Sequence, residues 1–106
     1  MFYEIRRYQT SPGRRDEWVR YMEDVVIPFQ ASAGMEVIAS FVDADDPDGY
    51  VWIRRFADEE HFAEATAAVY ESGRWKDEIS PVVGELLIRE KSVITRVVPT
   101  PASGLS

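Results

Sequence analysis

The chain of 106 residues contains no cysteine and a single histidine. The absence of cysteine excludes disulfides, thiolate metal sites, iron–sulfur clusters and thiol nucleophiles. No apolar run approaches the length that spans a membrane, and the N-terminal segment carries charge where a signal peptide needs apolar residues. We therefore expect a cytoplasmic protein with no membrane partner.

Basic residues are also scarce relative to acidic ones. The chain has 12 Lys and Arg residues against 19 Asp and Glu residues, which gives a formal net charge of -7. A surface that neutralises phosphates carries the opposite balance, so nucleic acid is not an expected partner. The chain also lacks a glycine-rich phosphate loop and a Ser–His–Asp order, which weakens the nucleotide-dependent and hydrolase classes. We expect no cofactor and no bound metal.

Apolar residues are plentiful, at 45% of the chain, and aromatic residues make up 12%. Such a chain has enough apolar surface to offset the entropy of ordering, and its length suits one domain. We place this domain at residues 1–98. The remaining residues, 99–106, are rich in proline, serine and glycine, and we expect a flexible C-terminal tail.

Hydrophobic periodicity and turn signals divide the domain into strands and helices. The helix expected at 14–30 carries Trp18, Met22 and Val26 on one face. Asp58 is the expected N-cap of the helix at 59–71. The expected elements are a strand at 2–8, a helix at 14–30, strands at 36–42 and 50–56, a helix at 59–71, a helical piece at 74–83 that kinks or restarts at Ser80-Pro81, and a strand at 89–98.

This order predicts an α+β, ferredoxin-like βαββαβ fold with a four-stranded antiparallel sheet of strand order 4-1-3-2. The helices would cover one face of the sheet. Large side chains alternate onto both faces of the first and third strands, so the other face also needs a cover. We expect a second copy of the chain to supply it, as a homodimer whose two sheets form a dimeric α+β barrel.

Several segments resemble one protein family. The run Tyr3-Glu4-Ile5-Arg6-Arg7-Tyr8 followed by Pro12-Gly13 resembles the start of NIPSNAP domains, within the dimeric α+β-barrel superfamily. Trp52-Ile53-Arg54-Arg55-Phe56, Gly73-Arg74-Trp75 and the ending at 92–99 continue the likeness, although the family more often has Trp where Arg54 stands and places its proline later than Pro81. The resemblance implies a homodimer with no established reaction.

The candidate ligand-binding residues are Glu4, Arg6, Tyr8, Trp52 and Arg54. Glu4 and Arg6 share a strand face, and Trp52 and Arg54 would lie on the neighbouring strand. One interpretation is the anion- or carbonyl-binding end of a small-molecule pocket, in which Arg6 is a fixed donor and Glu4 either orients it or acts as a base of raised pKa. The other is a buried or interfacial ion pair that sets dimer register and has no catalytic role.

Two further features have a chemical and a structural interpretation. His61 could act as a general base or, by analogy with haem-binding relatives in the superfamily, as a proximal haem ligand if it faced the sheet, or it could be an ordinary residue of the helix surface. The acidic turn at 43–49 partly matches a calcium loop, but Ala44 and Arg55 occupy its first and twelfth places, so a solvated hairpin tip is expected.

Three functional hypotheses follow. The first is a homodimeric small-molecule-binding protein of uncharacterised role, with its pocket between sheet and helices. The second is a cofactor-independent oxygenase or isomerase acting on an aromatic or polyketide-like compound, with Glu4, Arg6 and His61 as catalytic candidates. The third is a protein-interaction module that uses the dimer surface and the tail. The apolar side chains expected between sheet and helices are Trp18, Met22, Phe41, Trp52, Phe62 and Trp75.

Overall fold

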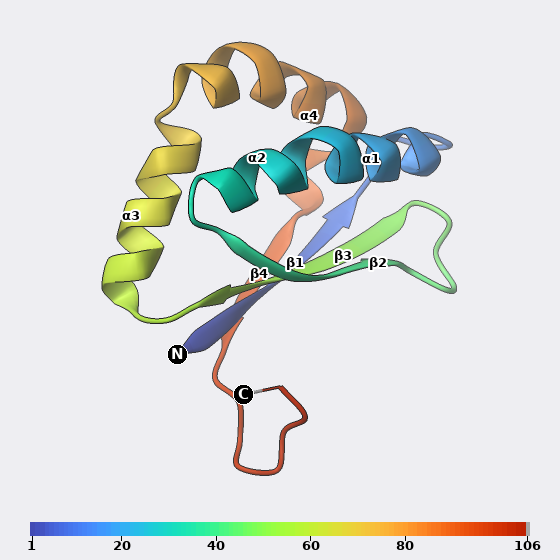
Figure 1. Cartoon of the computed structure of the whole chain (residues 1–106). Coiled ribbons are helices and arrows are strands. Elements are labelled where there is room, and N and C mark those ends of the chain that lie inside the picture. Colours follow the sequence, from blue (N-terminus) through green and yellow to red (C-terminus); the bar gives the residue numbers. More distant parts are fainter. Residues whose placement is uncertain (106) are drawn as a thin grey trace.

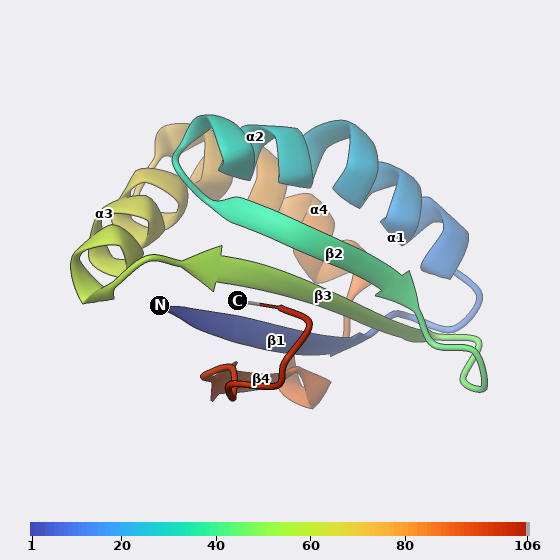
Figure 2. The ribbon, with the colours of Figure 1, turned by 60° about the horizontal axis from the view of Figure 1, so that its bottom comes forward.

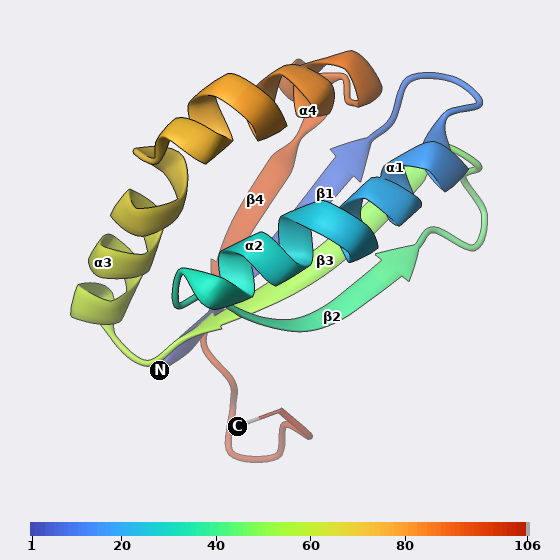
Figure 3. The same cartoon turned by 45° about the horizontal axis from the view of Figure 1, so that its top comes forward.

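The fold is an antiparallel sheet with all of its helices on one side (Figures 1 and 3). The computed structural model describes residues 1–105. Its elements are β1 (Phe2–Gln9), α1 (Arg15–Tyr21), the π-helix η1 (Met22–Val26), α2 (Ile27–Ser32), β2 (Glu36–Val42), β3 (Gly49–Phe56), α3 (Glu59–Tyr70), the π-helix η2 (Trp75–Ile79), α4 (Ser80–Leu86), the 3-10 helix η3 (Arg89–Lys91) and β4 (Val93–Val97).

The sheet has the order β2-β3-β1-β4, and all of its strand pairs are antiparallel. This is the predicted order 4-1-3-2 and confirms the ferredoxin-like α+β fold. Among residues 1–105, no helix is long and apolar enough to cross a membrane. The last strand is shorter than predicted, because residues 89–91 form a 3-10 turn before β4 begins.

A proline lies shortly after each of two π-helical turns. The predicted continuous helix at 14–30 is instead three segments, because Pro28 has no N–H to donate and its ring would clash with the carbonyl of Asp24. The N–H of Ile27 bonds five residues back to Met22, and α2 restarts with Pro28 in its first turn. Ser80 bonds in the same way to Trp75 ahead of Pro81, which confirms the predicted restart.

A bulge in β2 reverses the side on which its residues lie. Val37 pairs with Arg54 on the helix side, but the register shifts between Val37 and Ala39. Phe41 therefore pairs with Val51 on the opposite side and is 54% exposed. The expectation that Phe41 lies between sheet and helices is wrong. The inserted residue of the bulge moves every later side chain of β2 to the opposite side of the sheet, without changing the hydrophobic pattern of the sequence.

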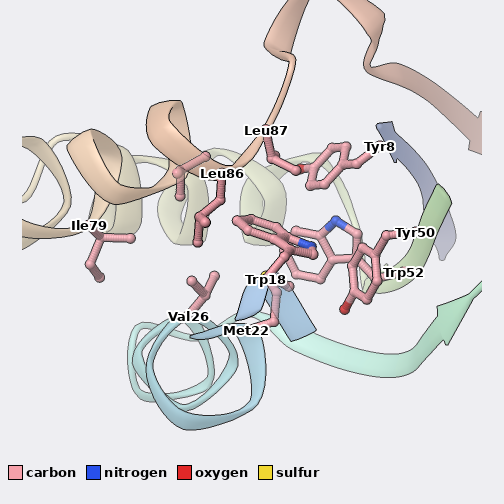
Figure 4. Close-up of a cluster of buried hydrophobic side chains, with 10 residues drawn as sticks. Tyr8, Trp18, Met22, Val26, Tyr50, Trp52, Ile79, Leu86 and Leu87 are labelled. Atoms are coloured by element: carbon pink, nitrogen blue, oxygen red, sulfur yellow. The ribbon is translucent and has the colours of Figure 1, made fainter. Parts of the chain in front are cut away.

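The main hydrophobic core lies between the sheet and the helices (Figure 4). Trp18 and Met22 come from the first helical region, and Tyr50 and Trp52 come from β3. Tyr8 of β1 meets the rings of Trp18 and Trp52 edge to face, with centroids 6.0 and 6.1 Å apart. A second cluster, around Phe2 and Phe56, packs under α3. The helices are thus anchored by aromatic rings that β1 and β3 project to one side.

We call the other side of the sheet the open face, because no helix covers it (Figure 2). On the two central strands it includes Ile5, Val51 and Ile53, which are partly exposed. Its remaining members are Tyr3, Arg7, Ala39, Phe41, Arg55, Val93, Thr95 and Val97. Residues 98–105 fold back over one end of this face and, with Tyr3 and Ile5, line a small open pocket of about 90 Å³.

The β2–β3 turn is held by hydrogen bonds from backbone amides to Asp43. Asp43 Oδ1 accepts from the N–H groups of Asp45 and Asp46, which lowers the pKa of this carboxyl. Gly49 starts β3 directly against this side chain. A Cβ at Gly49 would lie 2.7 Å from the Cβ of Asp43, so the position requires glycine for close approach.

We expect Gly49→Ala to lower the free energy of unfolding by about 1–3 kcal/mol, because the turn must shift to relieve this overlap. Chemical denaturation measures the change. Gly73→Ala is the matched control, since the nearest atom to its added Cβ is 3.8 Å away. Equal stability of the two variants would contradict the prediction.

Candidate functional site

Arg54 of β3 lies at the centre of a buried polar cluster. Its side chain is 1% exposed. The Nε and Nη2 atoms donate to Glu4 Oε1 at 3.2 and 2.6 Å, and Nη1 donates to Gln30 Oε1 at 2.9 Å and to the Tyr70 hydroxyl at 2.8 Å. The cluster therefore joins the sheet to α2 and to the C-terminal end of α3.

Arg6 of β1 is the second cation of the cluster. Its Nη1 donates to Glu4 Oε1 at 3.1 Å, and its Nε donates to the Tyr8 hydroxyl at 2.8 Å. The Arg6 and Arg54 guanidinium carbons lie 5.8 and 5.2 Å from the Trp52 ring centroid, within the range of cation–π attraction. One carboxylate thus faces two guanidinium groups over an indole.

Glu4 remains ionised in this setting. Burial by itself would raise the pKa of Glu4, but the charges and hydrogen bonds of Arg54 and Arg6 outweigh burial and lower it. Burial likewise opposes the charge of Arg6, yet Tyr8, Tyr70 and Glu4 together raise its pKa. The lowered pKa argues against Glu4 as a base of raised pKa, and its contacts with Arg6 and Arg54 favour a carboxylate that orients the two arginines.

A cavity of about 280 Å³ opens beside the cluster, between the sheet and the last helical region. Arg6 and Tyr8 line its sheet side, and Tyr70 and Trp75 meet edge to face at 4.8 Å on the helix side. Its other lining residues are Val83, Leu87, Arg89 and Ser92. An engineered cavity of about 150 Å³ is enough to bind benzene, so this space suits a molecule with one or two rings.

The structure brings together all five sequence-predicted ligand-binding residues. In the antiparallel register Glu4 lies opposite Arg54 and Arg6 opposite Trp52, as the strand order requires. Only Arg6 and Tyr8 of the five line the cavity, however. Glu4, Trp52 and Arg54 are buried behind them and can act on a ligand only through residues that they hold, such as Arg6 and Tyr70.

Other members of the site were not identified from the sequence. Gln30 was missed because a buried amide near the end of an amphipathic helix has the same pattern as an exposed one. Tyr70 lies on the predicted inner face of its helix, and only the third dimension shows that its hydroxyl meets Arg54. Arg89 belongs to the 3-10 turn that was predicted as strand.

His61 lies outside this cluster and holds the start of α3. Its Nδ1 accepts from the N–H of Ala57 at 3.0 Å, so Nε2 carries the proton and donates to the Gly34 carbonyl at 2.7 Å. The predicted N-cap is confirmed, because Asp58 accepts from the backbone N–H of His61. Both ring nitrogens are engaged by backbone, which supports the structural interpretation of His61.

The side chain of Arg15 binds the backbone of the acidic turn at 43–49. Arg15 Nη1 donates to the carbonyls of Asp43 and Asp46 at 3.0 and 2.7 Å, at the centre of the turn. Across residues 1–105, no three Asp, Glu or His side chains are grouped so as to hold a metal ion. The turn is therefore closed by an arginine and by backbone amides.

A four-stranded antiparallel sheet with helices on one side and a polar cluster beneath them defines a ferredoxin-like α+β protein. The NIPSNAP family model matches residues 3–103. The chain belongs to the NIPSNAP family.

Solved structures agree with this assignment. A NIPSNAP family protein with unknown function from Agrobacterium tumefaciens is 28% identical, with all of this chain and 94% of that one covered and a TM-score of 0.88. A second NIPSNAP family protein from the same organism is 24% identical, covers 99% and 98% of the two chains and has a TM-score of 0.87. An antibiotic biosynthesis monooxygenase, at 17% identity, shares the fold over 95% of this chain and 100% of that one with a TM-score of 0.68. No curated protein matches the chain.

We expect Glu4→Gln to lower the free energy of unfolding by about 3 kcal/mol at neutral pH, because it leaves Arg54 buried without an anion. Because the folded-state pKa of Glu4 is lowered, its carboxylate stabilises the fold above its ordinary pKa of 4.5, and this stabilisation is lost as the pH falls below that value. The stability difference between wild type and Glu4→Gln should therefore shrink in acid, as measured by denaturation at several pH values.

Glu85→Gln is the matched control for this prediction. Glu85 pairs with Arg14 at the surface, where its side chain is 65% exposed, so the change should cost less than about 0.5 kcal/mol. A pH-independent difference between wild type and Glu4→Gln would show that Glu4 is not held as an anion.

Proposed function

We propose that this NIPSNAP protein is a homodimer that binds a small molecule in the cavity beside Arg6. The observation that carries the proposal is the cluster of buried charge next to an aromatic-lined space. Pockets that bind small molecules are mostly apolar with a few fixed polar groups, which matches the Tyr70–Trp75 wall and the Arg6 donor. Arg6 is fixed by Tyr8 and Glu4 before any ligand arrives.

The open face supports the homodimer. Ile5, Val51 and Ile53 form an apolar centre on it, and Phe41 and Val93 extend this centre to the outer strands at 54% and 56% exposure. Arg7 lies between Val51 and Val93, but exposed apolar side chains gathered on one sheet face still mark an interaction site. The occupant we propose is a second copy, since two such sheets pack face to face by burying the same side chains.

A cofactor-independent oxygenase or isomerase is the second candidate. The fold that it shares with an antibiotic biosynthesis monooxygenase favours it, at the level of fold alone. Two of its proposed catalytic groups are already engaged, because Glu4 is paired with two arginines and His61 with two backbone groups. An enzyme built on this site would therefore rely on Arg6 and the phenols of Tyr8 and Tyr70.

The protein-interaction module is the third candidate, and the tail bears on it. Pro99 and Leu105 lie at the small cavity against Tyr3 and Ile53, so the tail packs on its own sheet. Its flexibility stays a prediction, as does the cytoplasmic location. Deleting residues 99–106 without loss of partner capture would contradict the version of this candidate that uses the tail.

The cavity is tested by native mass spectrometry of protein purified gently from its own cells. We expect an intact dimer that carries a discrete extra mass, and we expect Ser92→Trp, which fills the cavity, to remove that mass. Ala68→Trp on the exposed side of α3 is the control and should keep it. An extra mass that survives Ser92→Trp would place the ligand elsewhere.

The dimer is tested by Ile53→Glu. We expect this change to weaken association roughly a hundredfold or more, because it puts a charge at the apolar centre of the open face. Sedimentation velocity over a range of concentrations measures it. Ala68→Glu adds the same charge to an exposed helix surface and should leave the dimer intact. A wild-type protein that stays monomeric at all concentrations would overturn the homodimer.

A further inference from the structure

We propose that the cavity beside Arg6 binds a planar organic acid and that its carboxylate lies against Arg6, Tyr8 and Tyr70. This inference rests on the proposed function, since it names the class of molecule that occupies the same cavity.

The first observation is the charge of the cluster. Glu4 supplies one negative charge, whereas Arg54 and Arg6 supply two positive ones, and all three side chains are largely buried. The cluster therefore carries one uncompensated positive charge in a chain whose net charge is -7. Burying an unpaired charge is costly, and an anion at Arg6 would complete the pairing.

The charged side chains that line the cavity are also positive. Arg6 of β1 and Arg89 of η3 both line the cavity. Among residues 1–105, its lining includes no Asp or Glu. The carboxylate of Glu4 lies behind Arg6 and is already shared between two guanidinium groups. A cation entering the cavity would meet like charge, so the site selects against amines.

The second observation is the direction of the hydrogen bonds. The hydroxyl oxygens of Tyr8 and Tyr70 each accept from a guanidinium group. Each phenol also has one hydroxyl proton, which these bonds do not use. The hydroxyl groups of Tyr8 and Tyr70 can therefore each donate a hydrogen bond to another acceptor. Arg6 uses Nε and Nη1 within the cluster, which leaves Nη2 as a third donor.

Donors are in excess throughout this region. The buried Trp52 Nε1 and Gln30 Nε2 have no acceptor among residues 1–105. A ligand that offered only donors would add to this excess, whereas a carboxylate offers two acceptor oxygens and no donor. The hydrogen-bond inventory and the charge inventory therefore select the same chemical group.

The third observation fixes the rest of the molecule. Trp75 and Tyr70 present aromatic surface to the cavity, and Val83 and Leu87 close it with aliphatic side chains. These walls suit an apolar, flat body rather than a sugar or a polar chain. The volume of about 280 Å³ limits that body to one or two rings.

The test compares three one-ring probes of nearly equal size: benzoate, benzamide and benzylamine. Titration calorimetry of the full chain gives each dissociation constant, and the indole N–H signal of Trp75 reports whether a probe enters the cavity. We expect benzoate to bind at least about tenfold more tightly than benzamide. We expect benzylamine to bind least, and the preference for benzoate to fall as ionic strength rises.

Variants then locate the preference. Arg6→Gln should remove it, and Tyr70→Phe should reduce it while keeping Arg6 and its pairing with Glu4. Arg20→Gln removes one positive charge from the exposed side of α1, outside the cavity, and should leave all three affinities unchanged. If Arg6→Gln does not fold, Tyr70→Phe and the comparison of the three probes on wild type still test whether the cavity prefers an acid.

The outcomes separate the two proposals. Equal binding of benzoate and benzamide at the Trp75 signal would overturn the acid preference and leave the small-molecule cavity standing. A benzoate preference unchanged in both Arg6→Gln and Tyr70→Phe would also overturn it, since the acid would then be held elsewhere. No shift of the Trp75 signal with any probe in the millimolar range would count against the cavity as well as the acid.

Discussion

The buried guanidinium of Arg54 is the constraint on which the rest of the structure depends. An arginine cannot lose its proton inside a protein, so a side chain that is 1% exposed must be fully compensated by its neighbours. The compensation comes from Glu4 on the adjacent strand, Gln30 at the end of α2 and Tyr70 at the end of α3. Meeting this one requirement fixes where two helices dock on the sheet.

The same requirement fixes the register of the central strands. Glu4 reaches Arg54 only because the two residues are directly paired between β1 and β3. A slip of one residue would move Glu4 to the open face and leave Arg54 unpaired beneath the helices. An apolar core of equal volume would be no less stable, but it would tolerate such a slip more easily. The polar cluster thus selects a single arrangement of the sheet.

Much of this arrangement follows from the sequence. Alternation along residues 2–8 and 50–56, together with the strand order, is enough to place Glu4, Arg6, Trp52 and Arg54 on one surface. The bulge after Val37 could not be predicted, because an inserted residue leaves no trace in the hydrophobic pattern, and Phe41 was assigned to the wrong side for this reason. Proline marked both π-helical turns, but local sequence cannot show whether a helix bends, restarts or widens.

The partners of the cluster were hidden for a different reason. Gln30 and Tyr70 are 40 residues apart, and only the packing of α2 and α3 against β3 brings both side chains to Arg54. The excess of donors at the cavity could not be counted without these residues, since Tyr70 contributes one of the unused protons. Identifying the candidate residues therefore needed only strand pairing, whereas the class of ligand needed the whole hydrogen-bond network.

Residues of the polar cluster and residues of the open face alternate along the same two strands. Arg6 lies next to Ile5 in β1, and Trp52 lies next to Ile53 in β3, so each residue at the polar cluster has a neighbour on the open face. Under the proposed function, a ligand that holds Arg6 and a partner that holds Ile5 both order the same strand. Such coupling is reciprocal, because a ligand that strengthens the dimer must itself bind the dimer more tightly by the same factor. Under the proposed function, the central strands are the route by which occupancy would influence assembly, because they span from one face to the other.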